Sequence, residues 1–275
     1  DDQGNVTTPP GYKEAWDAMA EGGWGGMTGS PDYGGMGLPP VFGVYFSEVL
    51  IGACTAFSIY HGLSHGAADL IEHFGPDWMK DTCLEKMFAG EWGGTMCLTE
   101  AGAGTDVGAN RCKATPQDDG SYHLEGEKIF ISGGENDFTE NIIHLVLART
   151  PDAPSGSKGI SIFLVPKFHV NGDGSLGDRN DVKVVGIEHK MGINGSATCT
   201  LALGANGPCK GYLLGNEGDG LPIMFHLMNE ARIGVGAQGQ AIAAAAYEFA
   251  KAYAKERIQG TSLADIKNPD AERVA

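Results

Sequence analysis

The hydrophobic and polar positions follow a helical period through the first part of the chain. Apolar side chains recur at helical intervals over residues 40–74, and the small residues at 62–66 predict a break, so we expect two packed helices there. Residues 12–21 and 77–89 carry shorter helical patterns. Residues 1–94 are therefore predicted to form an N-terminal helical domain that is incomplete at its start.

The period changes to an alternation of apolar and polar positions near residue 95. Runs rich in Val, Ile and Leu occur from there on, separated by turn clusters, at residues 95–99, 121–132, 142–149, 159–166, 182–188 and 198–203. Each run is short and is soon succeeded by a turn, which leaves no room for a crossover helix and favours an antiparallel sandwich or barrel. Residues 95–215 are predicted to form this middle β domain.

A helical period returns after residue 215 and continues to about Ile258. A helix of that length is unusual in an isolated domain, so we expect it to pack on partners outside this chain. Residues 216–275 are predicted to be the first helix of a C-terminal helical bundle, which makes the whole a multi-domain α and β chain. The chain starts without Met and stops in a polar stretch, which suggests a fragment of a longer protein that lacks both ends.

Composition narrows the range of partners. Lys and Arg number 19 against 35 Asp and Glu, and the net charge of −16 disfavours binding to nucleic acid or to an anionic membrane surface. The six cysteines never stand in a C-x-x-C spacing, so we expect free thiols in a reducing compartment. No run of 18 apolar residues and no leader pattern is present, so we expect no membrane span and a cytoplasmic location.

Two histidines stand at a spacing that metal ligands use. His61 and His65 are four residues apart and share a helix face if that segment is helical, but no third ligand stands at a suitable spacing. Core-edge or surface histidines explain the pair without an ion, so no metal site is expected. Tyr45, Tyr60 and Trp78 are expected to pack in the core.

The candidate ligand-binding residues lie in two glycine-containing segments. Residues 96–108 are Met-Cys-Leu-Thr-Glu-Ala-Gly-Ala-Gly-Thr-Asp-Val-Gly, and residues 126–133 are Gly-Glu-Lys-Ile-Phe-Ile-Ser-Gly. A dinucleotide-binding turn would need a helix after the glycines, whereas the next residues lead into another strand. A tight β-turn with glycines chosen for positive φ explains the first segment without a ligand. The two segments also offer the uncharged donors and the apolar ring face that a flavin needs, namely Thr99, Thr105, Ser132 and Phe130.

Found together and in this order, these segments resemble the acyl-CoA dehydrogenase family of flavoproteins. Residues 96–107 resemble its first signature, and residues 126–133 resemble the strand that flanks the flavin. The similarity continues through residues 189–198, 217–221 and 254–260, so it covers nearly the whole chain. Several stretches are most similar to the subgroup that includes 3-methylmercaptopropionyl-CoA dehydrogenases. The family's order of helical, β and helical domains agrees with the order predicted from the hydrophobic pattern.

The resemblance implies that FAD is the cofactor. Thr99 would lie at the polar edge of the flavin ring and Thr105 near the pyrophosphate. Phe130 would flank the ring, and Ser132 would place a hydroxyl near its reactive edge. The residues that the resemblance assigns to FAD within one subunit are Met96, Leu98, Thr99, Gly104, Thr105, Phe130 and Ser132. Those that it assigns to the cofactor of a neighbouring subunit, and hence to a homodimer or homotetramer, are Arg257 and Gln259.

The reaction that the resemblance implies is FAD-dependent α,β-dehydrogenation of an acyl-CoA thioester, with electrons passed to an electron-transferring flavoprotein. Three residues match positions that contact the substrate: Thr105, Asn229 and Arg232. Asn229 replaces the family's frequent Asp, which puts that contact with CoA in doubt. The alternative is a non-dehydrogenase flavoprotein or a binding protein on the same scaffold.

The carboxylate that removes the α-proton is not expected in this chain. In most of the family it lies in the second half of the C-terminal helical domain, so we expect the base beyond Ala275 and no catalytic residue before it. A minority of members carry the base immediately before the arginine matched by Arg232. That position is Ala231 here, and Glu230 is about 100° around the helix from it, so Glu230 is predicted not to be the base.

Overall fold

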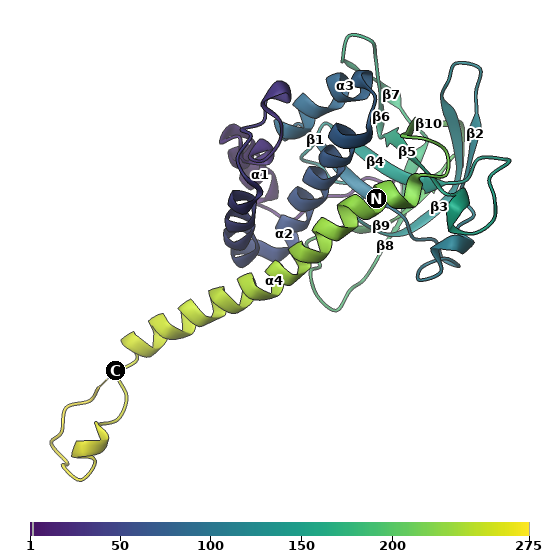
Figure 1. The fold of residues 1–275 in the computed structure, drawn as a ribbon. Coiled ribbons are helices and arrows are strands. Elements are labelled where there is room, and N and C mark those ends of the chain that lie inside the picture. The colour runs from purple at the N-terminus through teal and green to yellow at the C-terminus, as the bar shows by residue number, and fades with distance from the viewer. Residues whose placement is uncertain (2, 275) are drawn as a thin grey trace.

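The computed structural model describes residue 1 and residues 3–274. Helices cover one side of a β domain, and a long helix leaves the body toward the C-terminus (Figure 1). This order of helical, β and helical parts confirms the predicted fold class.

The helices that precede the β domain are α1 (Tyr12–Glu21), α2 (Pro40–Phe74) and α3 (Asp77–Phe88). The break expected at residues 62–66 is wrong, because α2 continues through them and departs from helical geometry at Cys54 instead (φ −157°, ψ 95°). Gly66 serves a close approach: a Cβ there would lie 3.0 Å from Leu227 Cγ on the C-terminal helix α4 (Gly220–Glu256).

The β domain contains both long and very short strands. Their bounds are β1 (Trp92–Cys97), β2 (Lys113–Pro116), β3 (Tyr122–Ser132), β4 (Asn141–Ala148), β5 (Ser161–Pro166), β6 (Phe168–Val170), β7 (Leu176–Arg179), β8 (Val182–Ile187), β9 (Thr198–Leu203) and β10 (Cys209–Leu214). Sequence analysis missed β2, β6, β7 and β10. β2, β6 and β7 have only three or four residues, too few for an alternation to show, whereas β10 is defined by pairing with β3 and β5, far earlier in the sequence.

The main sheet has the order β1-β4-β5-β10-β3-β9-β8, with β2 paired to β3, while β6 and β7 form a separate hairpin. All of these pairs are antiparallel except β1 and β4, which are parallel and place Thr95 opposite His144. The expectation of a wholly antiparallel domain is therefore wrong at this edge. The connection from β1 to β4 passes through β2 and β3, and that length permits parallel pairing.

Strand β4 lies between two apolar cores because its side chains alternate in direction. Ile143, Leu145 and Leu147 face the core shared with α2, α3 and α4. Val146 and Ala148 face the interior of the β domain. All five side chains are fully buried, so β4 fixes the position of its neighbour β1 relative to both the helices and the rest of the sheet.

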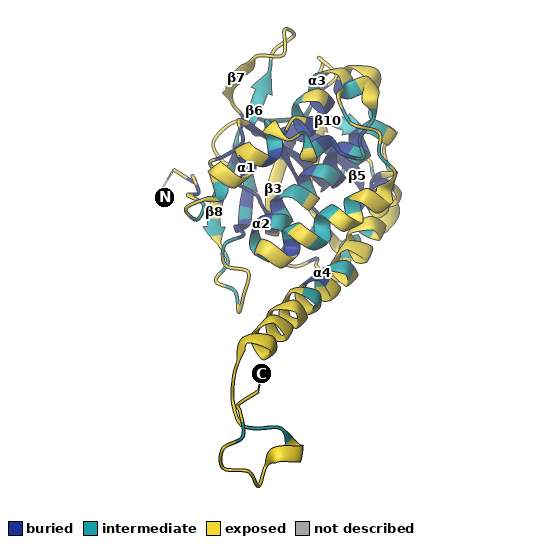
Figure 2. Cartoon of the chain, turned by 90° about the vertical axis from the view of Figure 1, so that its left-hand side faces the viewer, coloured by how far each residue is buried: buried dark blue, intermediate teal, exposed yellow. Residues whose placement is uncertain are grey.

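Helix α4 is buried at its first residue, Gly220, beside β5 and where it crosses α2. Ile223, Met224 and Leu227 pack into the core, and beyond them the helix is mostly exposed and extends away from the body (Figure 2). Large apolar side chains stand unprotected along this extension: Ile233, Val235, Ile242, Tyr247, Phe249 and Tyr253.

The first half of α2 also exposes apolar side chains. Tyr45 is 68% exposed and Trp78, on α3, is 47% exposed, so their expected place in the core is wrong, whereas Tyr60 is buried as expected. Among the described residues α2 is the one helix long and apolar enough to cross a membrane, by length and composition only. Its second half nevertheless packs as a core helix, with Leu70 and Ile71 fully buried.

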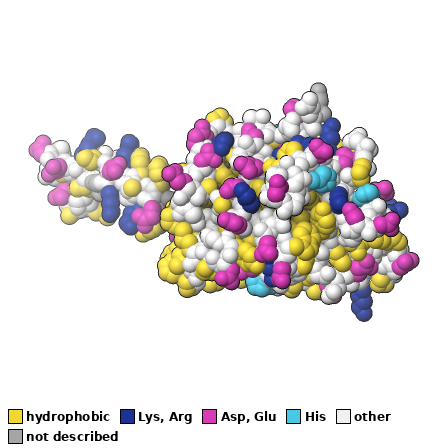
Figure 3. All heavy atoms as spheres, turned by 90° about the horizontal axis from the view of Figure 1, so that it is seen from above, with side chains coloured by type: hydrophobic (Ala, Val, Ile, Leu, Met, Phe, Trp, Pro, Cys, Tyr) yellow, Lys and Arg dark blue, Asp and Glu magenta, His cyan; other side chains and the backbone are white. Residues whose placement is uncertain are grey.

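Acidic side chains are scattered over the face that Figure 3 shows, and basic side chains do not gather there. This distribution agrees with the net charge of −16.

Candidate functional site

The ends of β1 and β3 bring together the two segments that the sequence singled out. We call residues 96–105 the turn segment and residues 128–132 the strand segment. The backbone N–H of Ile129 donates to the Thr99 carbonyl at 2.9 Å, and Lys128 Nζ donates to the Leu98 carbonyl at 3.2 Å. Residues separated by about thirty positions in sequence therefore form one continuous surface.

The strand segment contains a bulge that turns one aromatic side chain outward. The register of β3 against β9 shifts between Lys128 and Ile131. Within this bulge Phe130 has φ +59°, a left-handed conformation that costs an aromatic residue free energy, and its side chain is 57% exposed. Ile131 returns to the core. Backbone strain at an exposed ring is typical of a residue positioned for a ligand.

The turn segment exposes bare backbone. Glu100 and Ala103 close a tight turn by two backbone hydrogen bonds of 3.0 and 3.3 Å. Gly102 and Gly104 are exposed, and neither has a positive φ, so the explanation of these glycines by positive φ is wrong. A Cβ at Gly102 would meet open space, and one at Gly104 would lie 3.7 Å from Thr99 Cγ2. A small residue here leaves the peptide groups accessible to a ligand.

The connection beyond the turn excludes a dinucleotide fingerprint of the strand-turn-helix type. The chain continues into the short 3-10 helix η3 (Val107–Ala109) and then into β2, so no α-helix begins after the glycines. The Arg149 side chain holds this connection in place. Its guanidinium donates to the carbonyls of Gly108, Asn110, Pro154 and Gly156 at 2.6 to 3.0 Å.

A buried ion pair lies behind the two segments. Lys128 is completely buried, and its ammonium donates to Glu100 Oε1 at 2.9 Å and to Asn110 Oδ1 at 3.0 Å. Glu100 also accepts from the backbone N–H groups of Arg111 and Cys112 at 2.6 and 2.9 Å. The ammonium therefore links the strand segment to the turn segment and to η3. Sequence analysis missed it, although alternation along β3 gives Lys128 the same inward direction as buried Leu124.

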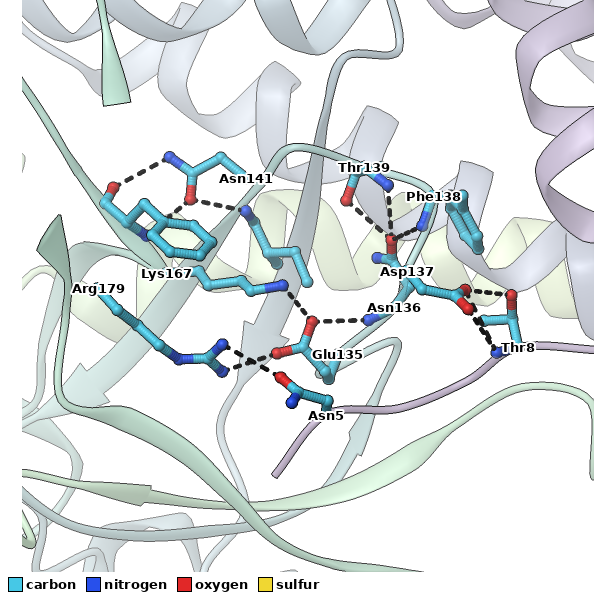
Figure 4. Close-up of polar contacts among 12 residues, drawn as sticks. Asn5, Thr8, Glu135, Asn136, Asp137, Phe138, Thr139, Asn141, Lys167 and Arg179 are labelled. Carbon is cyan, nitrogen blue, oxygen red and sulfur yellow. Dashed lines mark hydrogen bonds and ion pairs between the residues drawn. The ribbon is translucent and has the colours of Figure 1, made fainter. Parts of the chain in front are cut away.

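The loop after Ser132 is held by polar contacts that join three parts of the chain (Figure 4). Glu135 is buried and accepts from Lys167, and from Arg179 Nη2 at 2.9 Å. Asn136 Oδ1 accepts from the backbone and the hydroxyl of Thr139, each at 2.9 Å. These contacts fix the path of the chain immediately beyond the strand segment.

A buried histidine supports the strand that leads into the turn segment. His144 Nδ1 lies 2.8 Å from Thr95 Oγ1 across the parallel pair β1–β4. Burial lowers the pKa of His144 to about 3, so the imidazole is neutral near pH 7.

His61 and His65, on α2, lie outside the turn and strand segments. Desolvation lowers the pKa of the partly buried His61 to about 4, and His65 Nε2 lies 3.2 Å from Thr28 Oγ1. The six cysteines are free thiols, as expected, and five of them are buried.

The remaining predicted residues lie on or beyond α4. Arg257 and Gln259 are exposed past the end of this helix, at the far end of the molecule from the sheet, with Arg257 Nε donating to Gln259 Oε1 at 3.1 Å (Figure 1). Asn229 and Arg232 are on α4, where Arg232 is exposed and its guanidinium lies 5.4 Å from the Phe225 ring centre.

The structure thus brings together Met96, Leu98, Thr99, Gly104, Thr105, Phe130 and Ser132 and does not join the α4 residues to them. Met96 and Leu98 are partly buried against the core, while Gly104 and Thr105 are exposed. Glu230 Oε1 lies 4.0 Å from His65 Nε2, and the Glu230 side chain is 55% exposed. The roles of all these residues stay predictions.

Comparison with known proteins relates the sequence and fold of this chain to one group of enzymes. Residues 2–91 match the family described as acyl-CoA dehydrogenase, N-terminal domain, and residues 95–205 match acyl-CoA dehydrogenase, middle domain. Over 99% of its length the chain is 43% identical to 3-methylmercaptopropionyl-CoA dehydrogenase of Ruegeria pomeroyi, of which it covers 47%. The chain spans about half the length of that curated relative.

Solved structures with a similar fold include the following two. Butyryl-CoA dehydrogenase from Megasphaera elsdenii has a TM-score of 0.76 and 29% identity, with 93% of this chain and 65% of that chain covered. An acyl-CoA dehydrogenase from Bacillus anthracis, solved in complex with FAD, has a TM-score of 0.75 and 28% identity, with 90% and 39% covered.

Proposed function

The chain belongs to the acyl-CoA dehydrogenase family, and from this premise we propose that it supplies the FAD-binding surface of an enzyme that oxidises an acyl-CoA thioester. The observation that carries the proposal is the meeting of the turn segment, with its bare backbone at Gly104, and the strand segment, with its exposed Phe130, through hydrogen bonds to the Leu98 and Thr99 carbonyls.

The donor chemistry of this surface fits a flavin. Within the described chain the hydroxyls of Thr99, Thr105 and Ser132 have no hydrogen-bond partner, so they remain available to a ligand. They are uncharged, as is the exposed backbone of Gly102 and Gly104, which suits the polar edge of a ring and a pyrophosphate. Phe130 would contact the ring face, and Met96 and Leu98 would line its apolar side.

When bound, FAD would accept the hydride that leaves the β-carbon of the substrate. The chain's own part is to orient the cofactor through Thr99 and Ser132 and to hold it against Phe130. The base that removes the α-proton is proposed to lie outside residues 1–275. Ala231 occupies the alternative position of the base, and the exposed Glu230 carboxylate faces His65.

We further propose a short acyl-CoA as substrate, with 3-methylmercaptopropionyl-CoA first among the candidates. The names of the Ruegeria pomeroyi and Megasphaera elsdenii relatives specify two acyl groups that are both short. Thr105, Asn229 and Arg232 are the proposed contacts of the substrate within this chain.

The proposed partners rest on the same premise. An electron-transferring flavoprotein would accept the electrons, and a homodimer or homotetramer would bring Arg257 and Gln259 to a neighbouring cofactor. The exposed apolar side chains on the first half of α2 and the extension of α4 support packing against further protein. A cytoplasmic location is part of the proposal.

The test is anaerobic titration of the full-length, FAD-loaded protein with acyl-CoA thioesters, monitored by the visible absorbance of the flavin. We expect bleaching with 3-methylmercaptopropionyl-CoA and butyryl-CoA and much slower bleaching with a long-chain thioester. Bound FAD that no acyl-CoA bleaches would favour the alternative, a non-dehydrogenase flavoprotein on this scaffold.

A further inference from the structure

A group of three potential metal ligands lies where α2 crosses α4. Asp69 and His73 belong to α2, and His226 belongs to α4. Asp69 Oδ2 lies 3.0 Å from His226 Nε2, and Asp69 Oδ1 lies 3.3 Å from His73 Nδ1. One ligand atom from each residue falls within 4.8 Å of the other two. The three side chains thus converge on one small volume at the surface.

Core packing fixes the position of α4 relative to α2 at this point. Asp69 and His73 are four residues apart, so they project from the same face of α2. His226 lies between Met224 and Leu227, which are buried in the core shared with α2. An added Cβ at Gly66 would lie 3.0 Å from Leu227 Cγ, so a larger residue there would push Leu227 away. The backbone that presents the imidazole of His226 to α2 is therefore held rigidly.

The tautomer of His73 is fixed by its own helix. Its Nδ1 lies 2.9 Å from the Asp69 carbonyl oxygen, which accepts the Nδ1 proton and leaves the Nε2 lone pair free. A backbone carbonyl that fixes the tautomer of a histidine in this way is common at metal sites. His73 and His226 have ring centres 4.8 Å apart, so both imidazoles face the same carboxylate.

We propose that Asp69, His73 and His226 bind a divalent transition-metal ion such as Zn²⁺, which joins α2 to α4. Two imidazole nitrogens and one carboxylate oxygen match the ligands of Zn²⁺ and its neighbours and are a poor set for Mg²⁺ or Ca²⁺. Partial exposure of all three side chains leaves coordination positions for water. Binding through Nε2 of both histidines would replace the 3.0 Å contact between His226 Nε2 and Asp69 Oδ2 with metal bonds.

This site is independent of the proposed flavin chemistry, because none of its residues belongs to the turn or strand segment. Its consequence is structural: the ion would couple the start of α4 to the C-terminal end of α2. Further along, buried Ala241 and a hydrogen bond from Gln240 Nε2 to Glu48 Oε1 hold α4 against the first half of α2.

The test is calorimetric titration of the chelator-treated full-length protein with ZnCl₂, with MgCl₂ as the matched ion. We expect one Zn²⁺ per chain at this site, no Mg²⁺ binding, and at least a roughly tenfold loss of Zn²⁺ affinity in His226→Gln and in His73→Gln. His65→Gln is the control variant, since His65 lies near Glu230 rather than Asp69.

A second readout separates loss of the site from loss of the fold. Co²⁺ should give a visible absorption band in the wild type and in His65→Gln that is absent in Asp69→Asn. Circular dichroism should show the same helix content in all variants. Equal Zn²⁺ affinity in the wild type and His226→Gln, or no binding at all, would overturn the proposal.

Discussion

Replacing Lys128 by Met tests how the two segments of the candidate site are held together. Met has a similar length and apolar stem, so it fills the space while removing the ammonium. Three acceptors lose one of their donors: Glu100 Oε1, Asn110 Oδ1 and the Leu98 carbonyl. The substitution thus leaves a carboxylate without its cation inside the β domain.

The loss of unfolding free energy depends on how deeply the Lys128–Glu100 ion pair is buried. Removing one partner of a buried ion pair costs about 3–5 kcal/mol of unfolding free energy. Glu100 keeps the N–H donors of Arg111 and Cys112, which places the expected loss near the lower end, about 3 kcal/mol. Adding Glu100→Gln removes the uncompensated charge, so the double variant should show a coupling energy of about 1–3 kcal/mol.

The assay is urea unfolding of the purified protein, combined with FAD fluorescence to measure cofactor affinity. Lys113→Met is the matched control, because Lys113 is an exposed lysine on the neighbouring strand β2. We expect Lys128→Met to lose both stability and FAD affinity, since the side-chain link from the strand segment to the Leu98 carbonyl is lost. A loss below about 0.5 kcal/mol, equal to that of the control, would refute the reasoning.

Three further predictions concern single side chains. Phe130→Gly should be more stable than Phe130→Ala by about 1 kcal/mol in urea unfolding, because only glycine adopts φ +59° without strain. Both variants should bind FAD more weakly than the wild type. Equal stabilities of the two variants would contradict the strain at residue 130. His144 binds its proton more readily when unfolded, so its contribution to stability is complete above pH 6.5 and is lost as pH falls from there toward its folded pKa of about 3, by up to about 1.4 kcal/mol per pH unit. His144→Asn should flatten that slope between pH 7 and 5, and an unchanged slope would assign it to other groups. Cys54, the one cysteine of the six that is not buried, should react first with a thiol reagent; native-state labelling of buried Cys97 at the same rate would contradict the packing.

Local patterns were enough to predict most of the regular elements. The helical period over residues 77–89 and the alternation over residues 198–203 reflect contacts with a single buried face, so each segment carries its own signal. The position of the kink in α2 could not be predicted from small residues, because Gly66 is required by the approach of Leu227 rather than by a break.

Features that depend on pairing between distant segments were not predictable in the same way. Strand β10 and the parallel pair β1–β4 are defined by partners far along the chain. The segments of the candidate site were found from their composition, but the left-handed Phe130 depends on the register of β3 against β9. The burial of the Lys128 ammonium was likewise not predictable, because it depends on Glu100 and Asn110, which lie far from it in sequence and accept its hydrogen bonds.

The measurement that tests the central claim most directly is hydrogen–deuterium exchange of the full-length protein with and without FAD. The account predicts slower exchange on FAD binding in peptides that cover the turn segment, residues 96–105, and the strand segment, residues 128–132. Protection confined to other parts of the chain, with these two segments unchanged, would contradict it.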